Sequence, residues 1–204
     1  MDDSTPQPAA RAQERAAVPL TRGVHHLALT TEDMKMTADF YVDVLGMPLI
    51  HAMKVPAGLG TGAGNRGNPP YERLRHYFFD MGGDGVVAFF EIPRGEKGPS
   101  DRDAIGGMQH VAFSISAANF TALRDRLAAR GVPFDGPLEI MPGIYSMYFF
   151  DPNGIRLEAC CRPADGEAQR VIEQLQQTRA VAREELKTLH AEPAWLDHLT
   201  RHLS

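Results

Sequence analysis

The sequence of 204 residues contains an internal repeat, and this repeat limits the possible folds more than any other feature. Residues 23–30, with the sequence GVHHLALT, match residues 107–114, with the sequence GMQHVAFS, at an offset of 84. Each copy therefore opens with a short β-type segment that carries a histidine, His26 in the first and His110 in the second. A chain built this way is expected to fold as two similar modules related by approximate twofold symmetry.

The repeat continues through the rest of each copy. A stretch of helical character follows each opening strand, over residues 32–44 and 117–129. The sequence YFFD then occurs at residues 77–80 and again at 148–151, each time before a turn that contains glycine and a last strand. The last strands end in Glu91 and Glu158. Each copy is therefore predicted to contain a strand, a helix and three more strands.

The predicted fold is α+β, with two pseudo-symmetric βαβββ modules that form an open cupped barrel. The modules are residues 23–93 and 107–162, in one domain of residues 23–162. Residues 1–22 contain few large apolar groups and are expected to form a flexible tail. Residues 163–204 are expected to form a helical extension.

Two helices are expected in this extension. Apolar residues recur at steps of three to four over residues 166–189, which predicts one amphipathic helix. Pro193 opens a second, short helix that contains Trp195 and Leu196. These helices either pack on the domain or provide a contact between two copies of the chain.

Composition excludes several classes of partner and location. The net charge is −5, and the 21 Lys and Arg residues are scattered, so nucleic acid is not expected as a partner. No apolar run reaches the roughly 20 residues of a membrane helix, and Met1 is not followed by a signal segment. The only cysteines, Cys160 and Cys161, are adjacent in sequence, which disfavours a disulfide and favours the reducing cytoplasm.

The alternation of side chains along a strand indicates which residues share a face. His26 lies on one face with Ala28 and Thr30, and His110 lies with small residues in the same way. Both histidines are thus predicted to lie on the less apolar, concave faces of their modules.

The two glutamates need a partner. Glu91 ends a very apolar strand, and an unpaired buried carboxylate is costly unless it is exposed, paired or bound to a cation. The repeat brings two histidines and two glutamates toward one axis, and this combination suits a divalent metal. The predicted metal ligands are His26, Glu91, His110 and Glu158.

These residues resemble the vicinal-oxygen-chelate superfamily, which includes glyoxalase I, extradiol ring-cleaving dioxygenases and bleomycin-resistance proteins. His26, followed by Asp33 and by Leu45-Gly46-Met47, looks like the opening module of that family. Residues 151–158, with the sequence DPNGIRLE, look like its closing strand pair. The resemblance covers Gly23 to about Cys161. It implies a metal-dependent enzyme whose small-molecule substrate chelates the metal through two adjacent oxygens.

The resemblance leaves more than one reaction open. Similarity to extradiol dioxygenases implies Fe(II) held by His26, His110 and Glu158, with Tyr148 and Glu158 as catalytic residues. Similarity to glyoxalase I implies Glu91 as a fourth ligand, Glu158 as a base, and zinc, nickel or manganese as possible metals. Here Thr30 stands where glyoxalase I carries an arginine for the carboxylate of glutathione. We favour the dioxygenase.

Two further expectations concern the ligand and the assembly. The residues that could contact the substrate are Thr30 and, in the glycine-rich loop around residues 58–70, Arg66 and Tyr71. Family habit also implies a homodimer. A metal-free binding protein, similar to bleomycin-resistance proteins, is the remaining alternative.

Overall fold

The computed structural model describes residues 19–21, 23–56, 73–163 and 170–204. The described residues divide into two compact units, one within residues 23–171 and a second that contains residues 172–204. Within the described ranges, no helix is long and apolar enough to cross a membrane.

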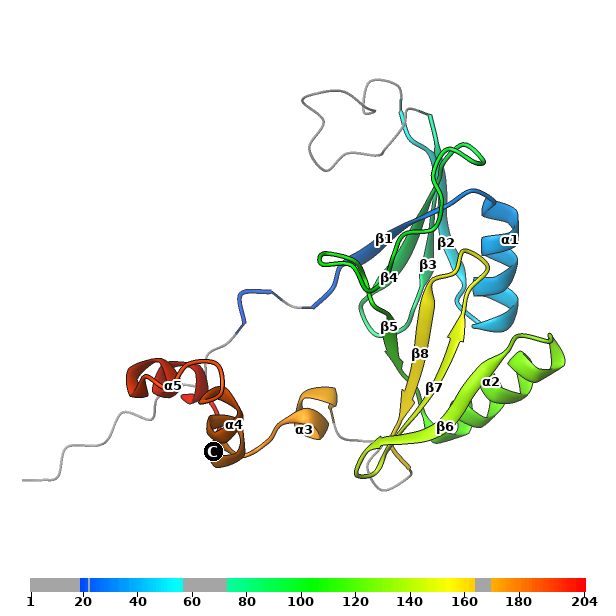
Figure 1. The fold of residues 1–204 in the computed structure, drawn as a ribbon. Coiled ribbons are helices and arrows are strands. Elements are labelled where there is room, and N and C mark those ends of the chain that lie inside the picture. Colours follow the sequence, from blue (N-terminus) through cyan, green and yellow to red (C-terminus); the bar gives the residue numbers. More distant parts are fainter. Residues whose placement is uncertain (1–18, 22, 57–72, 164–169) are drawn as a thin grey trace, which may run out of the picture. The chain divides into compact units, whose positions relative to one another are not determined.

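The first module folds as one sheet covered by short helices (Figure 1). Its elements are β1 (His26–Thr31), α1 (Met34–Asp39), the π-helix η1 (Phe40–Val44), β2 (Leu49–Lys54), β3 (Arg75–Asp80) and β4 (Val86–Glu91). The order of strands in the sheet is β1-β4-β3-β2, and β1 runs parallel to β4.

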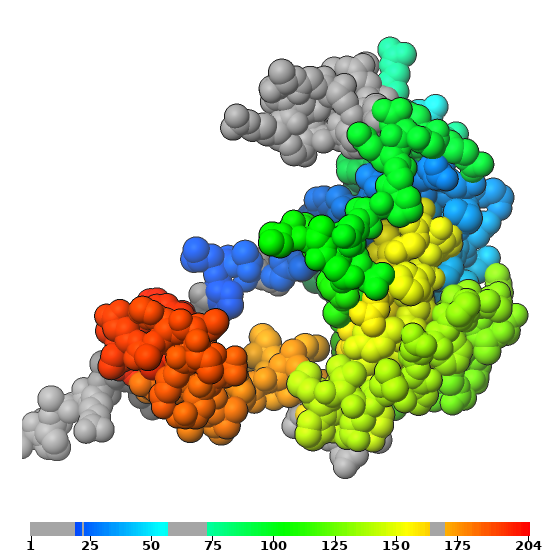
Figure 2. All heavy atoms as spheres, viewed as in Figure 1, coloured from blue at the N-terminus to red at the C-terminus, as the bar shows by residue number. Residues whose placement is uncertain are grey.

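The second module repeats this arrangement. Its elements are β5 (Val111–Ser114), α2 (Ala117–Ala129), β6 (Phe134–Met141), β7 (Ile144–Phe150) and β8 (Arg156–Cys161). The strand order β5-β8-β7-β6 matches that of the first sheet. The α+β fold with paired βαβββ modules is confirmed, and the two sheets remain separate rather than closing into a barrel. The connection between the modules lies on the surface of this unit, as the green segment in Figure 2 shows.

The helices begin and end where the sequence supplies the necessary caps. Asp33 accepts a hydrogen bond from the backbone N–H of Met36 at the start of α1, and Ser116 caps α2 through Asn119 in the same way. After the helical segments the chain reaches Gly46 and Gly131, at φ +72° and +67°. Only glycine adopts these left-handed conformations without a steric penalty, and they allow the chain to turn into β2 and β6.

One apolar core joins the two modules. It contains buried aromatic and aliphatic side chains from both copies of the repeat, with Tyr41, Phe79 and Phe89 from the first and Leu127, Phe149 and Leu157 from the second. All six are at most 1% exposed. The apolar faces of both sheets are therefore directed into this core, and their opposite faces are left to carry the polar side chains.

The second unit differs from the sequence prediction. The single helix expected over residues 166–189 is wrong, since the chain forms α3 (Val171–Leu175) and α4 (Arg179–Leu186) instead. The break arises because Thr178 is extended and caps α4 by accepting from the N–H of Val181. The predicted helix at Pro193 is confirmed as α5 (Pro193–Thr200), with the proline in the first turn.

Candidate metal centre and its surroundings

His110 and Glu158 form the centre of the second module's polar face. His110 immediately precedes β5, and Glu158 lies in β8. The Nε2 atom of His110 is 2.8 Å from Oε2 of Glu158, and the Glu158 side chain is only 4% exposed. Because Leu157 and Ala159 point into the core, the alternation along β8 turns Glu158 toward His110.

Three polar side chains surround Glu158. Ser146 donates a hydrogen bond of 2.5 Å from its hydroxyl to Oε1, and the Cys160 thiol donates to the same oxygen at 3.0 Å. Tyr148 lies directly opposite Glu158 across the β7–β8 pair, and its ring packs edge-on against the His110 ring at 6.1 Å. The Arg156 guanidinium lies 4.2 Å above the Tyr148 ring, in cation–π contact.

These contacts determine the protonation states of Glu158 and Tyr148. Burial would raise the pKa of Glu158, but hydrogen bonds from Cys160, Ser146 and Tyr148 outweigh it and hold the pKa below its usual value. Burial, followed by the hydrogen bond with Glu158, raises the pKa of Tyr148. At neutral pH the site therefore contains a carboxylate beside a protonated phenol, which can act as a hydrogen-bond donor.

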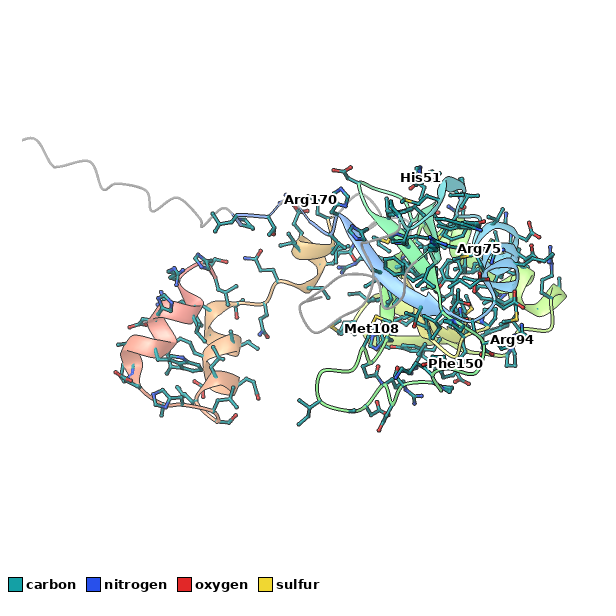
Figure 3. All side chains as sticks on the ribbon, turned by 90° about the horizontal axis from the view of Figure 1, so that it is seen from above. His51, Arg75, Arg94, Met108, Phe150 and Arg170 are labelled. Atoms are coloured by element: carbon teal, nitrogen blue, oxygen red, sulfur yellow. The ribbon has the colours of Figure 1, made fainter. Side chains whose placement is uncertain are left out.

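His26 lies in a different environment, on the polar face of the first sheet. The rings of His26, His51 and His76 lie 6.2, 5.5 and 4.2 Å from the ring of Phe78. His76 also stacks on Phe90 at 3.6 Å, and its Nε2 is the one buried side-chain nitrogen or oxygen in the described residues without a hydrogen-bond partner. His51 is labelled in Figure 3.

The structure does not bring His26 to the pair of His110 and Glu158. The described residues contain no contact between His26 and either of them, and no cluster of three or more metal-ligating side chains. One chain therefore presents the predicted ligands as a pair on the second module and a single histidine on the first.

Glu91 is not on the predicted face, which corrects its assignment beside His26. In the parallel pairing of β1 with β4, His26 lies opposite Val86 and Ala28 opposite Ala88. In the second module, Ala112 lies opposite Glu158. The position equivalent to Glu158 is thus Ala88, and Glu91, three residues further along β4, faces the opposite side of the sheet.

Glu91 has its own partners on that side. It accepts a hydrogen bond of 2.9 Å from the backbone N–H of Met34 and forms an ion pair with Arg75. It lines a pocket of about 370 Å³ at the end of the first sheet, together with Lys54, Arg75 and Arg94. Arg75 and Arg94 are labelled in Figure 3. The Glu91 carboxylate, predicted to bind a metal, is instead paired with protein groups.

Thr30, Arg66 and Tyr71 are the predicted substrate contacts. Thr30 is exposed and lies on the same face of β1 as His26. Arg66 and Tyr71 lie outside the described residues. The two copies of the sequence YFFD do not occupy equivalent positions in their sheets but differ by one residue in register. Tyr77 pairs with Phe89 and packs on the core, whereas Tyr148 pairs with Glu158. Phe78, not Tyr77, takes the place of Tyr148 on the polar face.

The pair of His110 and Glu158 has the chemistry of two neighbouring metal ligands. Imidazole nitrogen and carboxylate oxygen bind divalent metals at about 2.0–2.2 Å, so two adjacent ligand atoms on one ion are separated by about 3 Å. The 2.8 Å separation of Nε2 and Oε2 is compatible with this spacing. Hydrogen bonds from Ser146 and Cys160 to the other oxygen are the outer-shell support that ligating carboxylates require.

Three residues of this site, Ser146, Arg156 and Cys160, were not among the predicted site residues. Strand alternation places Arg156 and Cys160 on the face of Glu158, two residues before and after it, but indicates no role for them. Ser146 is two residues before Tyr148, so the same alternation places it on the face of Tyr148.

A family model for the "Glyoxalase/Bleomycin resistance protein/Dioxygenase superfamily" matches residues 23–159. Three solved structures illustrate the similarity of fold. A glyoxylase/bleomycin resistance protein/dioxygenase domain from Frankia sp. EAN1pec is 22% identical, with 70% of this chain and 98% of that chain covered and a TM-score of 0.54. A glyoxalase/dioxygenase from Nostoc punctiforme is 24% identical over 80% and 100% of the two chains, with a TM-score of 0.52.

The third structure is the genomically encoded fosfomycin resistance protein FosX from Listeria monocytogenes. It is 18% identical over 76% of this chain and 98% of that chain, with a TM-score of 0.51. A comparison with curated protein sequences finds no match. The family model covers well over half of the chain, from before β1 into β8, so the chain belongs to the glyoxalase/bleomycin resistance protein/dioxygenase superfamily.

Proposed function

We propose that this protein is a divalent-metal-dependent enzyme of the extradiol dioxygenase type, with His26, His110 and Glu158 as metal ligands. The observation that carries the proposal is the hydrogen-bonded arrangement of His110, Tyr148 and the buried carboxylate of Glu158 on the polar face of the second module. Two histidines and one carboxylate leave coordination positions open, which suits Fe(II) and oxygen chemistry. A bound Fe(II) would polarise two adjacent oxygens of a catechol-like substrate.

The protein groups have separate tasks in this proposal. Glu158 and His110 supply adjacent ligand atoms, while the raised pKa of Tyr148 keeps its hydroxyl able to donate to a substrate oxygen. Arg156 packs on the Tyr148 ring and restricts its orientation. The neighbouring residues on the faces of the two histidines, Ala28 and Ala112, are exposed and have small side chains.

The position of Glu91 disfavours the glyoxalase I alternative. A fourth ligand from β4 would have to lie on the face of His26, and that position is occupied by Ala88. Glu91 is therefore left out of the ligand set that we propose.

Homodimerisation is part of the proposal, because one chain does not assemble the three ligands. The faces of β1 and β5 that carry His26 and His110 are exposed in the single chain. We propose that a second copy supplies the missing histidine to each site. Closed twofold symmetry would then produce two equivalent centres.

The test is metal analysis of protein purified without oxygen or chelators, followed by oxygen uptake with catechols. The expected result is close to one iron per chain and oxygen consumption that requires catechol, both lost in His110→Ala. Stoichiometric zinc, nickel or manganese without oxygen uptake would indicate an isomerase or lyase. Failure to bind any metal after reconstitution would indicate a metal-free binding protein and overturn the proposal.

A further inference from the structure

The two oxygens of Glu158 have entirely different surroundings. Oε1 accepts hydrogen bonds from the Ser146 hydroxyl at 2.5 Å and from the Cys160 thiol at 3.0 Å. Oε2 faces Nε2 of His110 at 2.8 Å. Ser146 is completely buried, Glu158 is 3% exposed and Cys160 is partly exposed, so protein donors rather than bulk water surround Oε1.

This arrangement follows from strand register. Ser146 in β7 lies directly opposite Cys160 in β8, and paired residues project on the same face of the sheet. Their side chains meet beside the carboxylate, with Oγ and Sγ 3.3 Å apart. Two donors from two strands therefore converge on Oε1, whereas Oε2 faces His110.

We propose that Ser146 and Cys160 are positioning residues that hold Glu158 as a ligand through Oε2 alone. This inference rests on the metal site proposed above. A carboxylate fixed at one oxygen by two protein donors can neither rotate to bind a metal through both oxygens nor leave the metal to carry a proton. The same contacts make Glu158 a ligand that stays on the metal. This agrees with the dioxygenase proposal and disagrees with a glyoxalase-type reaction, in which this carboxylate would move to act as a base.

The chain offers matched variants for a test. Cys160→Ala removes the thiol donor, Cys160→Ser retains a donor of similar shape, and Ser146→Ala removes the hydroxyl donor. Ser114→Ala is the control, because Ser114 pairs with Cys160 across the sheet but has no hydrogen bond to Glu158 among the described contacts. Cys160 is partly exposed, so its replacement by alanine is not expected to prevent folding.

The experiment titrates full-length protein with Co(II) and records both affinity and the visible absorption of the bound ion. Loss of an outer-shell donor typically lowers metal affinity 10- to 100-fold, so we expect a loss of about 10-fold for Ser146→Ala and for Cys160→Ala. Cys160→Ser and Ser114→Ala should retain wild-type affinity. The double variant should lose at least as much affinity as either single variant. Its absorption spectrum should also change, since its carboxylate can bind the ion through both oxygens.

The outcomes separate this inference from the proposed function. Wild-type affinity and an unchanged spectrum in the double variant would overturn the positioning role while leaving the metal site intact. A Cys160→Ser variant as weak as Cys160→Ala would also overturn it, because the hydrogen bond would not be what matters. If the wild type itself bound no Co(II), the proposed function would fail, and the inference with it.

Discussion

The hydroxyl of Tyr41 donates a hydrogen bond of 3.2 Å to the carboxylate of Asp151, 110 residues further along the chain. Both side chains are buried, and the contact joins the helical segment of the first module to the turn between β7 and β8. Asn153 in the same turn accepts a hydrogen bond of 2.7 Å from Thr31 and donates one of 3.1 Å to Thr37. The turn of residues 151–154, with the sequence DPNG, therefore connects the two modules through hydrogen bonds at the edge of their shared core.

Tyr41→Phe should lower the free energy of unfolding by about 1–2 kcal/mol, since it removes one partner from a buried carboxylate without creating a large cavity. Urea unfolding followed by circular dichroism measures this difference. Tyr145→Phe is the control, because Tyr145 packs against the same core but is not the tyrosine that donates to Asp151. Equal stability losses in the two variants would mean that the contact with Asp151 contributes nothing.

Glu91→Gln should leave the metal content of the protein unchanged, because Glu91 faces Arg75 and Met34 on the opposite side of the sheet from His26. Glu158→Gln, the matched change at the proposed ligand, should abolish stoichiometric metal binding. Elemental analysis of both variants tests this contrast. A large loss of metal in Glu91→Gln would restore the four-ligand site.

Mixing His26→Ala chains with His110→Ala chains should restore about one quarter of the wild-type metal sites if each centre contains residues of two copies. The reason is that random exchange makes about half of the dimers mixed, and each mixed dimer has one intact centre and one that lacks both histidines. The measurement is metal per chain after unfolding and refolding the two variants together. Each variant refolded alone is the control, and no recovery in the mixture would show that the site belongs to a single chain.

His76 should make stability depend on pH. Burial, together with the nearby His26 and His51, lowers its pKa from the ordinary 6.5 to about 4. The unfolded chain therefore binds more protons than the folded one between these values, so stability is complete above about pH 6.5 and falls as the pH drops toward 4.

Between pH 7.5 and 4.5 the wild type should lose about 1–2 kcal/mol more unfolding free energy than His76→Phe, after allowance for solvent screening. Urea titrations at both pH values provide the comparison. His202→Gln, on an exposed part of the second unit, should behave like the wild type. Parallel pH profiles for the wild type and His76→Phe would contradict the lowered pKa.

The sequence by itself determined the two βαβββ modules, the faces of His26 and His110, and the glycines that end the helical segments. These features are local, because the period of a strand or helix and the left-handed preference of glycine act over a few residues. Only the tertiary structure decided that Ala88 rather than Glu91 corresponds to Glu158, and that Ser146 and Cys160 converge on one oxygen. Those outcomes depend on register between strands far apart in the chain, where a shift of one residue turns every side chain to the other face.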